Sequence, residues 1–277
     1  MSVTPVTMID GSNGDGAPTV WLGTSWKMTK TIEQARAYIG SLALVDIPAG
    51  MQVFVLPAHT ALAAVRDALD PNPSILLGAQ NAHWAPEGAA TGEVSMAMIR
   101  DAGARLVELG HSERRADFCE TDDRVARKVR AAIDADLIPL VCVGEPQDVR
   151  VSGGAGDFVA DQVAAAIAAL TPLEAERVLL AYEPIWAIGE HGRAATLGEV
   201  APVISAIRDV AASMTSSGRV AGVLYGGSVH ADNITELVTA PGVDGVFVGR
   251  AAWDAAGMGR LVELAGRARG LRGRSGV

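Results

Sequence analysis

The sequence predicts an α/β protein built as a single-domain, closed (β/α)8 barrel. Eight short apolar runs, most of them rich in β-branched residues, alternate with segments of helical periodicity, and the runs start about 32 residues apart. That spacing holds one strand, one helix and two loops, and strands that alternate with helices pair in parallel. Eight such units in about 250 residues fit a closed barrel better than a doubly wound sheet, which usually has fewer strands.

The eight expected strands are apolar runs of four to seven residues, the length of a buried strand. The first run is followed by Thr24 and Ser25 and lacks the G-x-G-x-x-G pattern of a dinucleotide-binding turn. Aromatic residues make up only 4% of the chain, so small and branched aliphatic side chains must build the core. In chain order, the expected strands are 20–23, 51–56, 75–79, 105–109, 137–143, 178–182, 220–225 and 243–248.

The segments between these runs have the apolar spacing of amphipathic helices. Two of them carry a helix entry signal: Thr121 precedes a pair of aspartates, and Asp232 precedes Asn233. In chain order, the expected helices are 32–44, 58–69, 94–102, 122–135, 158–170, 197–214, 233–238 and 254–265.

The two ends of the chain differ in composition from the rest. Residues 1–18 contain several glycines, Asn13, Asp15 and Pro18 without any period, which predicts a flexible N-terminal extension. Arginines alternate with glycines in 267–277, which predicts a flexible basic tail, and a solvated terminus is favoured there over a site for an anionic partner. The barrel is then expected over 19–266.

The overall composition excludes several classes of protein. The mean hydropathy is +0.24 with no apolar run of bilayer length, so neither a disordered chain nor a membrane protein is expected. The formal net charge of −9 disfavours nonspecific binding to nucleic acid. Two cysteines, Cys119 and Cys142, fit neither a disulfide framework nor a metal cluster, and the first residues lack an apolar leader, which predicts a cytoplasmic protein.

Polar residues follow most of the expected strands, where a barrel places its active site. A single lysine, histidine or glutamate at such a position is more often solvated or structural than catalytic. An ammonium group, an imidazole and a carboxylate from three separate strands would nevertheless meet in one mouth, and that convergence favours catalysis. The residues in question are Lys27, Gln80, Asn81, His111, Glu145 and Glu183, with glycine-rich turns at 226–228 and at Gly249.

The two glycine-rich turns predict a phosphate site. Backbone N–H groups in such loops approach an anion closely, and barrels often build a phosphate site after strands seven and eight. Gly227, Ser228 and Gly249, with Arg250 next in the chain, fit that site. Tight turns at the barrel rim explain the glycines but not the serine and arginine beside them. The implied ligand is a phosphorylated small molecule.

Six segments together resemble the signature segments of one known family, in that family's order. They are 26–28 (Trp-Lys-Met), 78–81 (Gly-Ala-Gln-Asn), 110–115 (Gly-His-Ser-Glu-Arg-Arg), 142–145 (Cys-Val-Gly-Glu), 181–189 (Ala-Tyr-Glu-Pro-Ile-Trp-Ala-Ile-Gly) and 225–229 (Tyr-Gly-Gly-Ser-Val). Six such strings do not recur together by chance. Over about residues 19–265, the chain is similar to the triosephosphate isomerase family, whose fold is the TIM barrel.

The resemblance implies an isomerase that moves a proton between adjacent carbons of a phosphorylated sugar, an intramolecular oxidoreductase without a cofactor or metal. In that family a glutamate is the base and a neutral histidine the electrophile, so the resemblance assigns these roles to Glu183 and His111. Lys27 would supply positive charge to the substrate and to the developing enediolate. Glu113 matches the family's supporting acid.

The segment 184–195 matches the family's closing lid, in which Gly189 would donate to the phosphate. The tip of this lid departs from the family, because Glu-His-Gly-Arg at 190–193 replaces a small tip that is rich in threonine and glycine. Ser25 replaces an active-site asparagine, and Arg250 replaces the second glycine of a pair. The implied substrate-binding residues are Ser25, Gly189, Gly227, Ser228, Gly249 and Arg250.

These departures spare the acid–base residues and alter their surroundings, the pattern expected when a reaction is kept and its substrate changes. The string Gly-Thr-Ser-Trp-Lys-Met at 23–28 resembles a branch of the family associated with erythritol catabolism, which interconverts L-erythrulose 1-phosphate and D-erythrulose 4-phosphate. That substrate is dihydroxyacetone phosphate with one more hydroxymethyl group on the reacting carbon, and Ser25 would open space there. The interconversion of dihydroxyacetone phosphate and D-glyceraldehyde 3-phosphate, the reaction that names the family, is the alternative.

Three further classes of protein fit the sequence less well. A Schiff-base aldolase on this fold needs a lysine on a late strand, yet the chain has three lysines and only Lys27 follows an expected strand. A metal-dependent hydrolase needs paired histidines, and no such spacing occurs. A non-catalytic phosphate-binding barrel would not require Lys27, His111 and Glu183 together.

One segment also carries an expectation about assembly. Residues 80–93 resemble the family's long third loop, which reaches into the active site of a second subunit. The resemblance therefore implies a homodimer.

Overall fold

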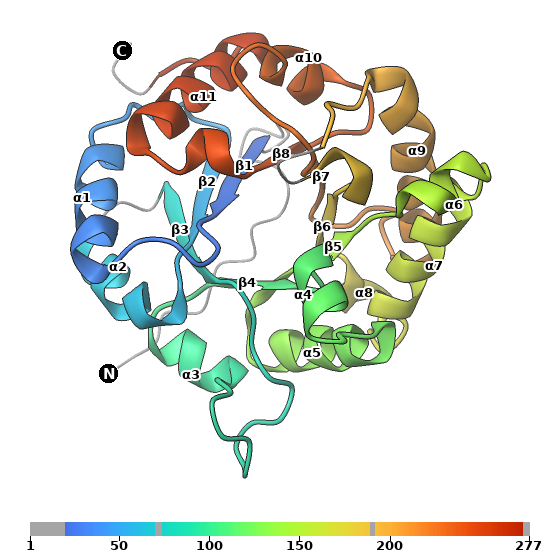
Figure 1. Cartoon of the computed structure of the whole chain (residues 1–277), viewed down its shortest axis with the longest axis horizontal. Helices are drawn as coiled ribbons and strands as arrows, with labels where there is room; N and C mark the ends of the chain where they lie inside the picture. Colours follow the sequence, from blue (N-terminus) through green and yellow to red (C-terminus); the bar gives the residue numbers. More distant parts are fainter. Residues whose placement is uncertain (1–19, 70–73, 189–191, 274–277) are drawn as a thin grey trace.

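The computed structural model describes residues 20–69, 74–188 and 192–273 and contains the expected closed barrel (Figure 1). Eight parallel strands follow one another in chain order, and β8 pairs with β1 to close the ring. The fold predicted from the sequence is confirmed. The strands are β1 (Val20–Ser25), β2 (Met51–Leu56), β3 (Ile75–Ala79), β4 (Leu106–Leu109), β5 (Ile138–Val143), β6 (Leu179–Tyr182), β7 (Gly222–Tyr225) and β8 (Gly245–Val248).

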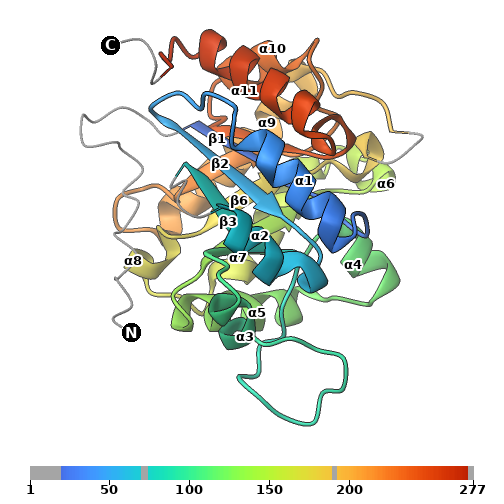
Figure 2. The ribbon, with the colours of Figure 1, turned by 90° about the vertical axis from the view of Figure 1, so that its left-hand side faces the viewer.

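Helices cover the outside of the barrel between successive strands, and the connection from β3 to α3 projects away from it (Figures 1 and 2). The helices are α1 (Ile32–Leu42), α2 (Leu62–Leu69), α3 (Met96–Asp101), α4 (Ser112–Asp117), α5 (Asp122–Asp134), α6 (Gln147–Val151), α7 (Ala155–Ile167), α8 (Pro172–Ala175), α9 (Leu197–Met214), α10 (Ile234–Thr239) and α11 (Ala255–Ala268). Three short 3-10 helices are η1 (His59–Ala61), η2 (Ile185–Ala187) and η3 (Arg250–Ala252). None of the helices in the described part of the chain combines the length and apolar character needed to cross a bilayer.

Side chains alternate between two apolar layers, as the period of a strand requires. On β1, Leu22 faces the helices, whereas Trp21 belongs to a cluster that fills the barrel interior. In that interior the rings of Phe54 and Phe247 stack with their centroids 5.7 Å apart. Gly23 makes room for the Phe54 ring, because a Cβ there would lie 1.9 Å from it. The interior is therefore packed and is not a pore, so a ligand can enter only above it.

Local signals predicted some helix ends and missed others. Thr121 caps α5 as expected, its hydroxyl accepting from the backbone N–H of Arg124. The expected cap at Asp232 is wrong: Asn233 occupies the cap position of α10, and its side chain accepts from the backbone N–H of His230. The short helices α4, α6 and α8 were not predicted, because each holds only four to six residues and shares its connection between two strands with a longer helix. Helices α3 and α10 are as short, but each is the single α-helix between two strands, where the barrel pattern requires one.

The last helix extends into the segment that the sequence predicts to be a basic tail. Helix α11 continues to Ala268, so Arg267 is helical and pairs with Glu263 at 2.6 Å. The guanidinium of Arg269 donates to the backbone oxygen of Val243 at 2.5 Å. The helix therefore ends two residues beyond 266, and the predicted domain boundaries stay predictions. The predicted extension at 1–18, the lid residues 189–191 and the last residues, 274–277, lie outside the described residues.

Candidate active site

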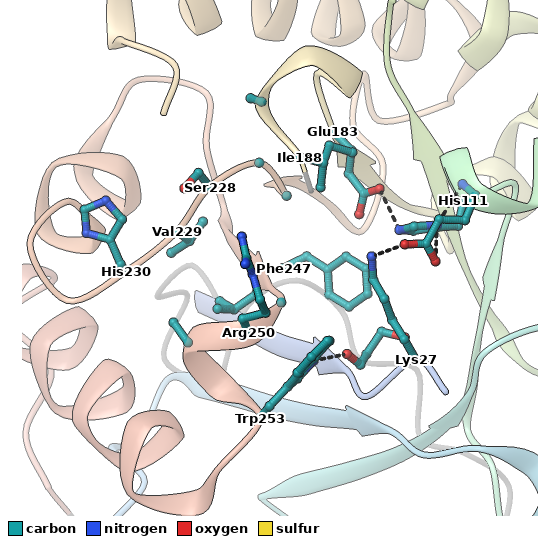
Figure 3. A pocket seen from close by; sticks show the side chains of 18 residues that line it. Lys27, His111, Glu183, Ile188, Ser228, Val229, His230, Phe247, Arg250 and Trp253 are labelled. Atoms are coloured by element: carbon teal, nitrogen blue, oxygen red, sulfur yellow. Dashed lines mark hydrogen bonds and ion pairs between the residues drawn. The ribbon is translucent and has the colours of Figure 1, made fainter. Parts of the chain in front are cut away.

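A pocket of about 460 Å³ opens above the carboxyl ends of the strands (Figure 3). This volume is typical of small-molecule sites. Gly189, the predicted lid donor, lies outside the described residues. All the other predicted site residues line the pocket: Ser25, Lys27, His111, Glu113, Glu183, Gly227, Ser228, Gly249 and Arg250.

Lys27 is held over the pocket by an unusual backbone conformation. Its φ is 51°, in the left-handed region that a residue with a Cβ seldom adopts. The side-chain amide of Gln80 supports this turn, donating to the backbone oxygens of Lys27 and Leu56 at 2.9 Å each. The ammonium group contacts Oε1 of Glu113 at 2.5 Å (Figure 3). Local strain at such a position is typical of a site whose geometry is fixed by its surroundings.

His111 caps the N-terminus of α4 and is held as a neutral donor. The backbone N–H of Glu113 donates to Nδ1 of the imidazole at 3.2 Å, so the ring proton is assigned to Nε2. Burial, followed by the positive charge of Lys27, lowers the pKa of His111 to about 4. The ring therefore stays neutral near pH 7, with Nε2 3.4 Å from Oε2 of Glu183 (Figure 3). This arrangement suits hydrogen-bond donation to a carbonyl oxygen.

Glu183 follows β6 and is 3% exposed. Its backbone N–H donates to the oxygen of Val143 at 2.7 Å, which anchors the residue to the end of β5. Gly226 permits the close approach of β7, because a Cβ there would lie 2.6 Å from Cγ of Glu183. Burial, and then the nearby Glu108 carboxyl, raises the pKa of Glu183 well above its usual range. A carboxylate with a raised pKa is a stronger base, as proton abstraction from carbon requires.

Replacing Glu183 with glutamine is expected to stabilise the fold at pH 8 and to do so much less at pH 5. In the unfolded chain this carboxyl ionises near the ordinary glutamate pKa of 4.5, whereas in the folded protein it does so only at higher pH. Stability is therefore lost as the pH rises from the unfolded pKa to the folded pKa. Each unit of difference corresponds to about 1.4 kcal/mol, and each kcal/mol to about 2–4 °C in Tm for a chain near this size. Thermal unfolding at both pH values measures the change, and an equal rise in Tm at both would contradict it.

The other strand-end polar residues support the site without lining it. Glu145 accepts from Nε1 of Trp186 at 2.7 Å and from the hydroxyl of Tyr182 at 3.2 Å, which fixes the chain on both sides of Glu183. The side-chain oxygen of Asn81 accepts from Nζ of Lys128 at 2.7 Å. These residues occupy the predicted strand ends, but their side chains belong to the scaffold.

The glycine-rich turns form the opposite wall of the pocket. Figure 3 shows Ser228 and Arg250 across the cavity from Lys27 and His111. The turn that carries Ser228 is fixed by Asn233, whose amide donates to the backbone oxygen of Ser228 at 2.8 Å. The pocket thus has an acid–base side and a side that suits an anion.

Sequence reasoning missed two residues next to the site. Nε1 of Trp253 donates to the backbone oxygen of Ser25 at 2.9 Å (Figure 3). Glu108 accepts from the hydroxyl of Ser25 at 2.9 Å inside the barrel. The available signal for Glu108 was a charged residue in the middle of the apolar run Leu-Val-Glu-Leu.

Comparisons with known proteins agree with this architecture. The model of the triosephosphate isomerase family matches residues 20–265. Three relatives, each named L-erythrulose-1-phosphate isomerase, come from Mycolicibacterium smegmatis (47% identical; 90% of this chain and 94% of the relative covered), Rhizobium rhizogenes (44%; 92% and 98%) and Brucella abortus biovar 1 (43%; 86% and 93%). This chain therefore belongs to the triosephosphate isomerase family.

Proposed function

We propose that this protein is a sugar-phosphate isomerase that interconverts L-erythrulose 1-phosphate and D-erythrulose 4-phosphate through an enediolate, without a cofactor. The convergence of Lys27, His111 and Glu183 in one pocket, opposite two glycine-rich turns, carries this proposal. The names of the relatives support the choice of the four-carbon substrate. A place in erythritol catabolism is part of the same proposal.

The proposed reaction moves one proton between two adjacent carbons. The carboxylate of Glu183 takes the proton from the hydroxyl-bearing carbon, while Nε2–H of His111 donates to the neighbouring carbonyl oxygen. The two carbons then share the enediolate, whose negative charge the ammonium of Lys27 stabilises in a largely buried pocket. Glu183 returns the proton to the other carbon, and His111 passes the hydroxyl proton from one oxygen of the enediolate to the other. The carbonyl and the hydroxyl have then exchanged places, with no net change in protons or electrons.

Glu113 contributes by holding the lysine. Its carboxylate contacts the Lys27 ammonium at 2.5 Å, and its backbone N–H sets the tautomer of His111. Both contacts come from the first turn of α4, so one short helix orients two reacting groups. On the opposite wall, Gly227, Ser228, Gly249 and Arg250 would hold the phosphate.

Substrate choice is expected to depend on Ser25. The wild-type protein should show a higher kcat/KM for L-erythrulose 1-phosphate than for dihydroxyacetone phosphate, and Ser25→Asn should narrow or reverse that ratio. The reason is that one extra hydroxymethyl group in a fitted pocket is worth about 1–3 kcal/mol, or roughly 10- to 200-fold. Steady-state kinetics with both substrates measure the ratio.

A control in the opposite wall separates substrate choice from phosphate binding. Both substrates carry the same phosphate, so Ser228→Ala should weaken kcat/KM for both alike and leave the ratio unchanged. If the wild-type protein turns over triose phosphates at least ten times more efficiently, the tetrulose proposal is wrong. The protein would then be an ordinary triosephosphate isomerase with an unusual first loop.

A homodimer and a cytoplasmic location complete the proposal. The connection from β3 to α3 projects from the barrel (Figures 1 and 2), and its base is tied by the backbone N–H of His83, which donates to the oxygen of Val94 at 2.7 Å. A projecting loop with a fixed base is suited to contact a second subunit. The two free cysteines, Cys119 and Cys142, fit a reducing compartment. The acidic net charge argues against nucleic acid as a partner.

A further inference from the structure

The barrel interior holds a carboxyl group that the proton-transfer scheme does not use. Glu108 lies on β4 and is 3% exposed. The interior residues around it are mostly apolar, such as Leu106 and Leu140. Burying a carboxyl group in such surroundings is unfavourable in free energy unless the group is hydrogen-bonded, so its hydrogen-bond partners indicate its role.

Those contacts lead to the floor of the active-site pocket. The hydroxyl of Ser25 on β1 donates to Oε2 of Glu108 at 2.9 Å, and the thiol of Cys142 on β5 lies 3.9 Å from Oε1. Ser25 lines the pocket whereas Glu108 does not, so Glu108 reaches the pocket through Ser25. The backbone of Ser25 is fixed separately by Nε1 of Trp253.

The chemistry of this pair determines what Ser25 can offer to a ligand. An ionised carboxylate only accepts hydrogen bonds, so the single O–H of Ser25 is committed to Glu108. The remaining lone pairs of the serine oxygen are then free to accept a hydrogen bond. Without Glu108, the hydroxyl could rotate and donate into the pocket instead.

We propose that Glu108 is a positioning residue that holds Ser25 Oγ as a hydrogen-bond acceptor for the additional hydroxyl of a four-carbon sugar phosphate. This inference rests on the proposed function and deepens it. It explains why a serine at the end of β1 is accompanied by a buried carboxyl group beneath the pocket. Leaving a buried polar group without its hydrogen-bond partner discriminates between two substrates more strongly than a difference in pocket volume does.

The protonation state of Glu108 provides a second, independent test of this proposal. Burial raises the pKa of Glu108 to about 7, although the hydrogen bond from Ser25 and the charge of Lys27 act to lower it. As the pH rises through about 7, the carboxylate form increases and should raise the preference for the tetrulose phosphate. The other groups that face it, Cys142 and Glu183, and the more distant charges of Glu113 and Arg114, act on both substrates and cancel in a ratio.

The test is the ratio of kcat/KM for L-erythrulose 1-phosphate to that for dihydroxyacetone phosphate. At pH 8, E108L should lower this ratio about tenfold, because leucine fills the space without an acceptor. In the S25A background, E108L should cause no further change. E108Q keeps an acceptor oxygen without the charge, so its ratio should stay within about threefold of wild type and lose its dependence on pH.

Thr24→Val is the matched control, because Thr24 is also a buried hydroxyl residue on β1 but alternates to the helix side of the strand. Its ratio should equal that of wild type. The inference is overturned if the ratio of the E108L variant stays within twofold of the wild-type ratio. It is also overturned if E108L lowers the ratio equally in the wild-type and S25A backgrounds. If E108L does not fold, a ratio that still rises through pH 7 in E108Q overturns it. A wild-type ratio of 0.1 or less contradicts the proposed function instead, because this inference concerns only the response to Glu108.

Discussion

Replacing Glu183 with aspartate is expected to lower kcat by about 10²-fold or more, while KM changes much less. The change withdraws the carboxylate by one methylene from a position 3.4 Å from Nε2 of His111. The side chain is buried after β6 and cannot shift far to compensate. A misplacement of about 1 Å at a reacting group is enough for a loss of this size. Steady-state kinetics with the tetrulose and triose phosphates measure it.

Glu263→Asp provides the control, because the same shortening there affects two ion pairs on α11, with Arg260 and Arg267, that lie outside the pocket. It should leave kcat unchanged. A Glu183→Asp protein whose kcat stays within threefold of wild type would remove Glu183 from the role of base. The pH dependence of kcat/KM gives a further check, because its acid limb should lie above pH 4.5 in the wild type.

Replacing His111 with glutamine is expected to lower kcat by about 10²-fold, again with a smaller change in KM. Glutamine keeps an N–H donor near the carbonyl oxygen but cannot exchange a proton between the two oxygens of an enediolate. The low pKa of His111, about 4, keeps the wild-type ring neutral. The loss should therefore be nearly constant from pH 6 to pH 9, which rate measurements across that range would show.

His59→Gln is the corresponding control. Nε2 of His59 contacts the backbone oxygen of Asn81 at 2.7 Å, and a glutamine amide can keep that contact outside the pocket. Its kcat should match that of wild type. A near-normal kcat with a raised KM in the His111 variant would show that this histidine binds substrate without shuttling protons.

The sequence alone determined the barrel and most of its elements. Strands β2 and β3 and helix α9 begin and end where the apolar pattern predicts. These features are local: the period of a strand or helix, and a cap such as Thr121, depend on residues within a few positions of each other. Helices α4, α6 and α8 and the true cap of α10 escaped prediction because a few residues carry no reliable period.

The same local reasoning placed Lys27, His111 and Glu183 at strand ends, and a parallel barrel necessarily brings strand ends together. It could not determine which side chains point into the pocket. Gln80, Asn81 and Glu145 stand at equivalent positions yet hydrogen-bond to the scaffold.

Only the tertiary structure revealed the pairing of Ser25 with Glu108, two residues 83 positions apart in the chain. Their contact depends on the closure of the barrel, which brings β1 and β4 to a common interior. Burial there strengthens the hydrogen bond between them. A pattern along the chain shows that a charged residue lies in a strand, but its partner is set by packing across the barrel.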